Sequence, residues 1–283
     1  MSPTPKIWFI TGASSGFGRS MAELLLKKGD IVIATLRKPE VLSDLTAQYP
    51  ADKLLVVKLD VTNKADVVHA FSKAQEVFGR IDVVFNNAGQ NVLGEVESLS
   101  DESARQLFEV NFWGAVTVSR EAIRFFREVN KPVGGKLLQV SSRLGIIGGP
   151  ASAFYSASKF ALEGLSESLL REIDPAWNIK ITIVEPGPFR TKIVAENIRV
   201  APQHPAYADP SSPSSQFRKF ITSGAVDGDA DKAVAAIEKL VHIDNPPLRL
   251  PLHKRTVASA KEKASSILED VKKYESWSDD LYF

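Results

Sequence analysis

Short apolar runs alternate with longer amphipathic runs along most of the chain. The apolar runs are rich in Val, Ile and Leu, which is typical of strands buried on both faces of a parallel sheet. They predict strands at Ile7–Thr11, Ile31–Thr35, Leu54–Leu59, Ile81–Asn86, Gly135–Val140, Lys180–Val184 and Leu248–Leu250. The amphipathic runs have a helical period and predict helices at Phe17–Lys28, Val41–Tyr49, Lys64–Phe78, Glu102–Asn130, Ser152–Ile173 and Asp229–Ile243.

Strands and helices are therefore expected to alternate from end to end, which indicates an α/β fold. We predict a Rossmann-type, doubly wound parallel sheet of about seven strands with helices on both faces. No internal repeat or low-complexity linker divides the sequence, so we expect residues 1–283 to form a single domain.

Two segments depart from this alternation. Residues 188–228 are rich in proline and serine, and long irregular segments in compact domains are lids, binding loops or disordered connectors. We predict a substrate lid there, with a passive surface loop as the alternative. Residues 255–283 are expected to form a C-terminal tail that is helical over Thr256–Tyr274.

The predicted lid contains apolar side chains that suit a medium or bulky apolar ligand: Phe189, Ile193, Val194, Ile198 and Phe217. The opposite wall is expected to come from Leu144, Ile146 and Ile147. Two glycines are expected to act as hinges, Gly224 and Gly228.

Composition excludes several functional classes. The formal net charge of +1 gives no basic surface for nucleic acid. The chain has no cysteine, and its four histidines are far apart, so we expect no metal site. No signal peptide or membrane-spanning run is recognisable, so we expect a cytoplasmic protein that does not insert into a membrane.

A glycine-rich turn follows the first predicted strand, and its residues are expected to bind a nucleotide: Gly12, Ser14, Ser15, Gly16, Phe17 and Gly18. Glycines permit a sharp turn and a close approach of the backbone to a pyrophosphate. The next helix then presents its free N–H groups to the phosphates. A plain strand–turn–helix connection is the alternative.

The ends of the following strands supply further candidates. The second strand is followed by Arg37 where NAD-binding proteins commonly carry a carboxylate, and a guanidinium there suits the 2′-phosphate of NADP, with Ser14 as a second donor. Asp60 and Val61 are expected beside the adenine, although an Asp in this place also caps helices. Near the ribose we expect Asn87, Ala88 and Gly89.

Tyr155 and Lys159 are four residues apart, which places both side chains on one face of a helix. A neighbouring ammonium favours the phenolate and lowers the pKa of a tyrosine. Such a phenol can exchange a proton with a carbonyl or alcohol oxygen. A nucleotide cradle and a tuned phenol on one chain suggest hydride transfer.

Taken in order, these motifs resemble those of the short-chain dehydrogenase/reductase family. The glycine motif is Thr11–Gly18, a second motif is Asn86–Gly89, and a third runs from Pro186 to Thr191. The resemblance implies four catalytic residues: Asn111, Ser142, Tyr155 and Lys159. It also implies that the nicotinamide is held by Tyr155, Lys159, Pro186, Gly187, Phe189 and Thr191.

Within that family, the sequences around Arg37 and Lys159 resemble the branch of 17β-hydroxysteroid dehydrogenase type 1 and the retinol dehydrogenases. That branch prefers NADP and acts on bulky apolar carbonyls and alcohols. The resemblance therefore implies NADPH-dependent reduction of a ketone or aldehyde, and a homodimer or homotetramer. Ser141 is expected to be a structural partner, and Arg143 to turn toward solvent. A catalytically idle NADP-binding sensor or scaffold is the main alternative, and an epimerase or dehydratase is another.

Overall fold

The computed structural model describes residues 4–191, 198–224 and 226–283. Seven parallel strands form one sheet in the order β3-β2-β1-β4-β6-β7-β9. Their bounds are β1 (Ile7–Thr11), β2 (Ile31–Leu36), β3 (Leu54–Lys58), β4 (Val83–Asn86), β6 (Gly135–Val140), β7 (Ile179–Pro186) and β9 (Arg249–Leu252). The sheet confirms the predicted doubly wound fold, with all seven strands close to their expected positions.

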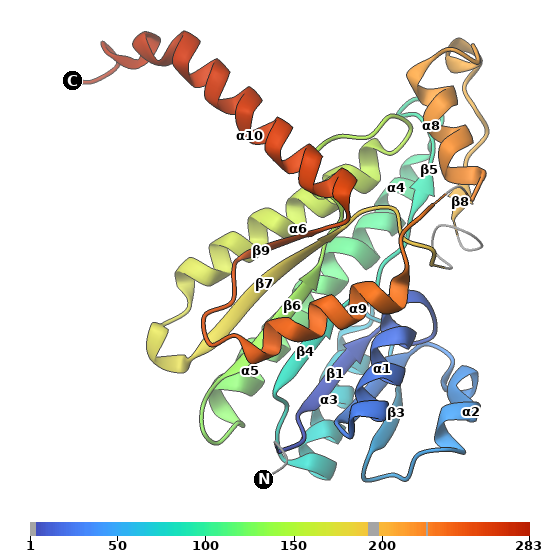
Figure 1. Ribbon diagram of the computed structural model, residues 1–283, viewed down its shortest axis with the longest axis vertical. Coiled ribbons are helices and arrows are strands. Elements are labelled where there is room, and N and C mark those ends of the chain that lie inside the picture. The colour runs from blue at the N-terminus through green and yellow to red at the C-terminus, as the bar shows by residue number, and fades with distance from the viewer. Residues whose placement is uncertain (1–3, 192–197, 225) are drawn as a thin grey trace.

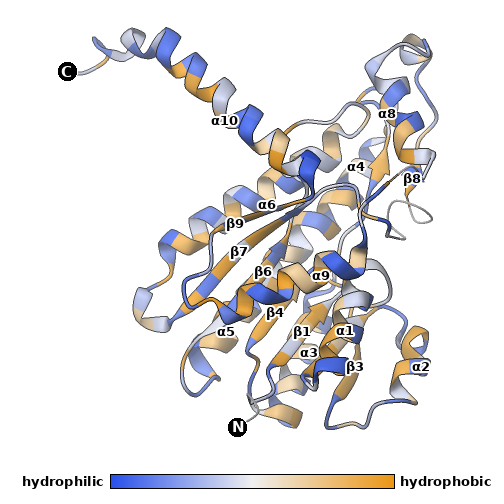
Figure 2. Cartoon of the chain, in the orientation of Figure 1, coloured by the Kyte–Doolittle hydropathy of each residue, from blue (hydrophilic) through white to orange (hydrophobic). Residues whose placement is uncertain are grey.

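Helices cover both faces of the sheet (Figure 1). One face is packed against α1 (Gly16–Lys28), α2 (Ser43–Thr46) and α9 (Ala230–Glu238). The other is packed against α3 (Lys64–Phe78), α5 (Ala115–Glu128) and α6 (Ala153–Glu172). The hydrophobic residues concentrate in the strands between these two layers (Figure 2). Burial of large side chains such as Trp8 and Phe9, each worth about 1.5–3 kcal/mol, stabilises both layers.

Two predicted helices are divided in the structure. The segment expected over Val41–Tyr49 consists of a 3₁₀ turn, η1 (Pro39–Leu42), followed by the short α2. The segment expected over Glu102–Asn130 consists of α4 (Asp101–Phe108), a π-helical turn η2 (Glu109–Gly114) and α5. Amphipathic spacing alone does not reveal a π turn, because the apolar face continues through it.

Parts of the segment predicted to be irregular have regular structure in its described residues. It contains β8 (Arg199–Val200), the 3₁₀ turn η5 (Pro205–Tyr207) and α8 (Pro213–Thr222). β8 pairs in parallel with β5 (Val92–Leu93), a strand that was not predicted. Pro213 begins α8 because proline fits the first turn of a helix, with Ser212 as its N-cap. Proline content therefore did not reveal that part of this segment is helical.

The chain ends in α10 (Lys254–Tyr274) and η7 (Glu275–Ser278), as the sequence indicated. The first turns of α10 lie on the body of the protein, and the rest of the helix projects away from it (Figure 1). The remaining turns are η3 (Arg143–Gly145), η4 (Pro175–Trp177) and η6 (Lys239–His242). Within the described ranges, no helix combines the length and apolar character needed to cross a membrane.

Candidate active site

A cavity of about 460 Å³ lies at the carboxyl ends of the strands. Of the predicted site residues, the following line it: Gly12, Ser14, Ser15, Gly16, Phe17, Arg37, Asp60, Val61, Asn87, Ala88, Gly89, Ser142, Tyr155, Lys159, Pro186, Gly187, Phe189 and Thr191. Gly18 and Asn111 lie behind the lining. The topology therefore brings residues from seven separate segments of the chain to one cavity.

The glycine-rich turn has no room for side chains at two positions. Gly12 has φ +68°, and a Cβ there would lie 2.9 Å from the Cα of Ala88. At Gly18 a Cβ would lie 2.2 Å from the carbonyl oxygen of Gly12. The turn therefore packs as tightly as a backbone cradle for a pyrophosphate requires, and these residues fit a dinucleotide.

The N-terminus of α1 faces this cradle with its own N–H groups available. Its N-cap, Ser15, makes no capping hydrogen bond through its side chain, and the first turn contains no acidic residue. A phosphate placed there would accept hydrogen bonds and face the positive end of the helix dipole. The neighbouring turn is fixed by Thr11, whose Oγ1 accepts hydrogen bonds from the backbone N–H groups of Asn87 and Ala88 at 2.9 and 3.0 Å.

At one end of the cavity lie Arg37 and Asp60. Arg37 is exposed after β2 and forms no ion pair with the described part of the chain. One carboxylate oxygen of Asp60 accepts hydrogen bonds from the backbone N–H and the hydroxyl of Thr62, at 3.0 and 2.8 Å. Asp60 therefore stabilises its own turn while it lines the cavity.

Ser142, Tyr155 and Lys159 meet in the middle of the cavity wall. Ser142 follows β6, while Tyr155 and Lys159 lie on consecutive turns of α6. The Ser142 hydroxyl hydrogen-bonds to the phenol of Tyr155. The Lys159 Nζ lies 5.9 Å from the centre of the Tyr155 ring and donates a hydrogen bond to the carbonyl oxygen of Val140 at 2.9 Å.

Burial affects both ionisable groups of this trio. It raises the pKa of Tyr155, and the hydrogen bond from Ser142 opposes this only in part. Burial also lowers the pKa of Lys159 to about 8, against the attraction of Glu163. The sequence predicted that Lys159 lowers the pKa of Tyr155. That prediction is wrong for the protein alone, because desolvation is the largest effect on the phenol.

Asn111 lies in the π turn η2, immediately behind the cavity. Its side chain accepts a hydrogen bond from the backbone N–H of Gln90 at 2.8 Å and donates one to the Gln90 carbonyl at 2.9 Å. It also donates to the hydroxyl of Ser158 at 3.2 Å. Asn111 thus joins α6 to the segment after β4. A Cβ at Gly89 would lie 3.4 Å from its Oδ1 and 3.6 Å from the Nζ of Lys159.

A partly buried charged network next to Lys159 on α6 was not predicted. Ser141 donates a hydrogen bond to Glu163 at 2.5 Å, and Glu163 forms an ion pair with Arg249 at 2.5 Å. Arg249 also pairs with Glu185 and Glu167. Burial, together with the charge of Glu163, raises the pKa of Glu185 to about 7. Spacing on α6 places Glu163 one turn after Lys159, but only the sheet topology reveals its partner on β9.

The substrate end of the cavity is lined by apolar side chains: Leu144, Phe189, Phe217, Phe220 and Ile221. Ile146, Ile147 and Ile198, which were also expected to line a substrate site, are not part of this lining, and Ile193 and Val194 lie outside the described residues. Of the two predicted hinge glycines, Gly224 has a positive φ of +66°. Gly228 is hydrogen-bonded to the start of the predicted lid, because its N–H donates to the carbonyl of Pro188 at 3.1 Å.

Arg143 contradicts its prediction. Instead of turning to solvent, it is half-buried in the cavity wall, with its Nη1 3.5 Å from the hydroxyl of Ser259 on α10. The short turn η3 and the base of α10 hold the side chain on the cavity side. Sequence could not indicate this, because α10 lies more than a hundred residues away in the chain.

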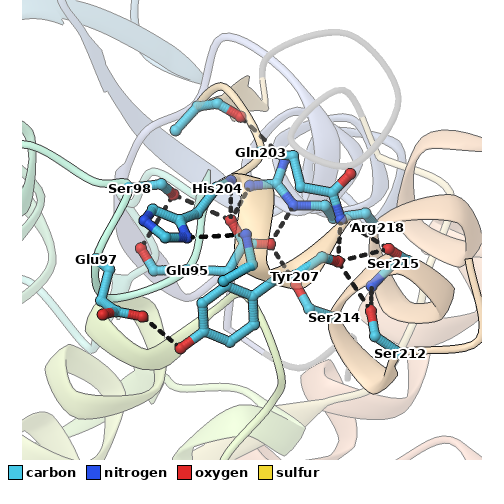
Figure 3. A network of polar contacts seen from close by, with 12 residues as sticks. Glu95, Glu97, Ser98, Gln203, His204, Tyr207, Ser212, Ser214, Ser215 and Arg218 are labelled. Carbon is cyan, nitrogen blue, oxygen red and sulfur yellow. Dashed lines mark hydrogen bonds and ion pairs between the residues drawn. The ribbon is translucent and has the colours of Figure 1, made fainter. Parts of the chain in front are cut away.

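The predicted lid is attached to the body through a buried ion pair (Figure 3). Arg218 on α8 donates from Nε and Nη2 to the two carboxylate oxygens of Glu95, at 2.7 and 2.6 Å. The side chains of Arg218 and Glu95 are 10% and 3% exposed. Ser214 also donates to Glu95, and the phenol of Tyr207 donates to Glu97 at 2.6 Å. These contacts fix α8 with Phe217 and Phe220 at the cavity.

Comparison with known sequences agrees with this geometry. The family model described as short chain dehydrogenase matches residues 6–200. An uncharacterized oxidoreductase of Schizosaccharomyces pombe is 38% identical over 273 residues, which cover 96% of this chain and 90% of that protein. Retinol dehydrogenase 8 of Homo sapiens is 35% identical over 206 residues, which cover 69% of this chain and 64% of that protein.

Solved structures give the same result. A short-chain dehydrogenase from Streptomyces avermitilis is 34% identical with a TM-score of 0.89, and the match covers 99% of this chain and 100% of that one. A short chain dehydrogenase from Burkholderia cenocepacia, solved in complex with NADP, is 26% identical with a TM-score of 0.72. That match covers 96% of this chain and 98% of that one.

Proposed function

The chain belongs to the short-chain dehydrogenase/reductase family, and we propose that it is an NADPH-dependent reductase that converts a ketone or aldehyde to an alcohol. The single observation that carries the proposal is the shared cavity. Ser142, Tyr155 and Lys159 line the same cavity as the glycine-rich turn and the N-terminus of α1. A protein that only senses the nucleotide would need the cradle but not this trio.

The roles of the trio follow from their contacts. Ser142 would donate a hydrogen bond to the carbonyl oxygen of the substrate, and Tyr155 would give that oxygen its proton. Burial raises the pKa of Tyr155, so in the free protein the phenol carries the proton that it would donate. Bound NADPH supplies the hydride. Lys159 would hold the ribose hydroxyls, while Asn111 supports the assembly from behind.

Preference for NADPH is supported by the end of β2. Arg37 lines the cavity there without a carboxylate partner in the described structure, and Ser14 lines it as well. A guanidinium binds a phosphate group with charge-assisted hydrogen bonds. The NADP complex of the Burkholderia cenocepacia relative, which has the same fold, also supports the proposal.

An apolar carbonyl substrate is supported by the lining of the cavity and by α8. Phe217, Phe220 and Ile221 face the cavity, and Arg218 between them fixes the helix to Glu95. We propose that this helix selects the substrate and excludes water from the reacting atoms. The name of the human relative, a retinol dehydrogenase, is consistent with an apolar substrate.

We also propose that copies of the chain pair through the face formed by η2 and α6. Trp113 and Phe160 are exposed there by 51% and 41%. Exposed aromatic residues on neighbouring helices favour a subunit interface. Sedimentation of the wild type and of Trp113→Ser would test this, since a monomeric wild type would contradict the pairing.

The experiment that tests the reductase is a panel of apolar ketones and aldehydes, incubated with the protein and NADPH. Loss of absorbance at the reduced nicotinamide band measures turnover, and the alcohol is identified by mass spectrometry. We expect turnover with NADPH and at least tenfold less with NADH. Tight binding of NADPH without turnover of any carbonyl would support the sensor instead.

A further inference from the structure

Arg143 occupies a position that the proposed reaction does not explain. It directly follows Ser142 and lines the cavity at the end where Leu144 and Phe220 also lie. Among the described residues, its guanidinium makes one hydrogen bond, and that contact is long, 3.5 Å to the hydroxyl of Ser259. Partial burial of the guanidinium lowers the pKa of Arg143. A half-buried charge is costly unless a partner of opposite charge compensates it.

No carboxylate in the described structure compensates this charge. Among the residues that line the cavity, the acidic one is Asp60, which follows β3. Arg143 follows β6, four strand positions away, which corresponds to about 19 Å. Arg199 also lines the cavity, but it is a second cation, and its guanidinium donates to the neutral amide oxygen of Gln106 at 2.8 Å.

The surroundings of Arg143 add positive charge. The first turn of α10 begins with Lys254 and Arg255 and contains no acidic residue. The Arg255 guanidinium lies 4.8 Å from the centre of the Phe220 ring, and its charge lowers the pKa of Arg143 further. The hydroxyl of Thr256 in the same turn is buried and without a hydrogen-bond partner in the described residues. Asp227 lies near Arg255, but its carboxylate pairs with His253 at 3.0 Å. This end of the cavity therefore combines apolar walls with the positive charge of Arg143.

The phosphates of the nucleotide do not account for this charge. The residues that fit them are the glycine-rich turn after β1, the N-terminus of α1, and Arg37 after β2. β4 lies between β1 and β6 in the sheet, so the segment that carries Arg143 is two strand positions from the glycine-rich turn. The position of Arg143 beside Ser142 places it next to the substrate carbonyl of the proposed reaction.

We propose that Arg143 binds the carboxylate of the substrate, so that the preferred substrates are keto acids with an apolar chain. The inference rests on the proposed reductase function and narrows it. The carbonyl would lie at Ser142 and Tyr155, the carboxylate at Arg143, and the chain against Phe217, Phe220 and Ile221. A guanidinium holds a carboxylate with charge-assisted hydrogen bonds, and each such contact contributes to discrimination against a neutral analogue.

The test compares straight-chain ten-carbon keto acids that differ in the position of the carbonyl, each beside its own methyl ester. The ester keeps the chain and the carbonyl but removes the charge. For the best acid we expect kcat/KM to exceed that of its ester by about ten- to a hundredfold. In Arg143→Met the ratio should fall to about one, and in Arg143→Lys it should lie between the two.

Arg171→Met is the matched control, because Arg171 is exposed on α6 and does not line the cavity. It makes the same change of net charge and should leave the ratio as in the wild type. Calorimetric titration of the keto acids into the protein with NADP⁺ measures the same preference without turnover. There, Arg143→Met should weaken binding of the best acid at least tenfold.

The outcomes separate the two proposals. Turnover of esters and acids at equal rates, with an unchanged ratio in Arg143→Met, would overturn the role of Arg143 and leave the reductase standing. Absence of turnover with acid binding that depends on Arg143 would contradict the reductase but support the anion site. Equal weakening by Arg143→Met and Arg171→Met would show that net charge alone is responsible, and the inference would fail.

Discussion

The Nζ of Lys159 donates its hydrogen bond to the carbonyl oxygen of Val140, the last residue of β6, at 2.9 Å. The next two residues of the chain are Ser141 and Ser142. The end of one strand therefore anchors the lysine and also delivers the serine that meets Tyr155. The positions of the three side chains are thus set by the end of β6 together with α6.

Tyr155→Phe is expected to keep cofactor affinity and lose turnover. The ring still fills its place on α6, but the proton donor is absent. General acid catalysis contributes about a hundred- to ten-thousandfold, so kcat should fall by that factor. Binding of NADPH is measured by fluorescence and turnover by absorbance. If most of the activity survives in a variant that binds NADPH normally, Tyr155 is not the acid.

Lys159→Met provides the complementary result. Lys159 is 4% exposed and approaches both Tyr155 and Gly89. We expect the substitution to weaken NADPH binding and to reduce kcat, because the ammonium is proposed to serve both. If Lys159→Met loses turnover but binds NADPH as tightly as the wild type, Lys159 does not bind the cofactor.

Arg37→Asp is expected to reverse the cofactor preference. Loss of a charge-assisted contact to the 2′-phosphate costs about 1.5–3 kcal/mol, or roughly ten- to a hundredfold in affinity for NADPH. Affinity for NADH should fall little or rise. Lys38→Asp is the matched control, since Lys38 is exposed beside Arg37 but does not line the cavity. Equal binding of NADH and NADPH by the wild type would refute the preference.

Arg218→Met is expected to destabilise the protein by about 3–5 kcal/mol, because it leaves the Glu95 carboxylate buried without its partner. KM for apolar substrates should rise, since α8 loses its attachment. The double variant Glu95→Leu/Arg218→Met should be more stable than Arg218→Met. Lys73→Met removes an exposed ion pair with Glu76 and should cost less than about 1 kcal/mol in urea unfolding.

Glu185 should make stability depend on pH. Burial and the charge of Glu163 raise the pKa of Glu185 from 4.5 to about 7, so the folded state binds its proton more tightly than the unfolded state does. The resulting stabilisation is complete below about pH 4.5 and is lost as the pH rises through 7. In Glu185→Gln, the free energy of unfolding should therefore fall less over this range.

Urea unfolding at several pH values measures that slope. Glu167→Gln is the control, because Glu167 pairs with the same Arg249 but its side chain is 39% exposed. An identical pH slope in the wild type and in Glu185→Gln would show that Glu185 does not titrate in this range.

Much of the fold could be predicted because its signals are local. Strands such as β1 and β6 are buried on both faces, so their apolar runs identify them without reference to neighbours. The glycine-rich turn was predictable for a similar reason, because Gly12 and Gly18 have no room for a Cβ. Helical spacing placed Tyr155 and Lys159 on one face of a helix, and the family resemblance then implied their catalytic roles.

The rest depends on contacts between distant segments. Arg143 was expected in solvent because nothing near it in sequence covers it, yet Ser259 does. The lid was expected to be irregular, but the Glu95–Arg218 pair fixes a helix there across more than a hundred residues. The pKa of Tyr155 was predicted from one neighbour, whereas burial by the whole fold determines its direction.

The π turn at residues 109–114 gives the long helix one more residue than regular α-helical winding would hold there. Deleting a single residue from it would let the hydrogen-bond ladder run uninterrupted from Asp101 to Glu128. Every residue before the deletion would then rotate by about 100° relative to those after it. Either Asn111 would lose its hydrogen bonds to Gln90 and Ser158, or α4 would lose its packing against α6. The π turn thus corrects the rotational phase of the helix. It allows α4 to pack against α6 while Asn111 keeps its hydrogen bonds to Gln90 and Ser158.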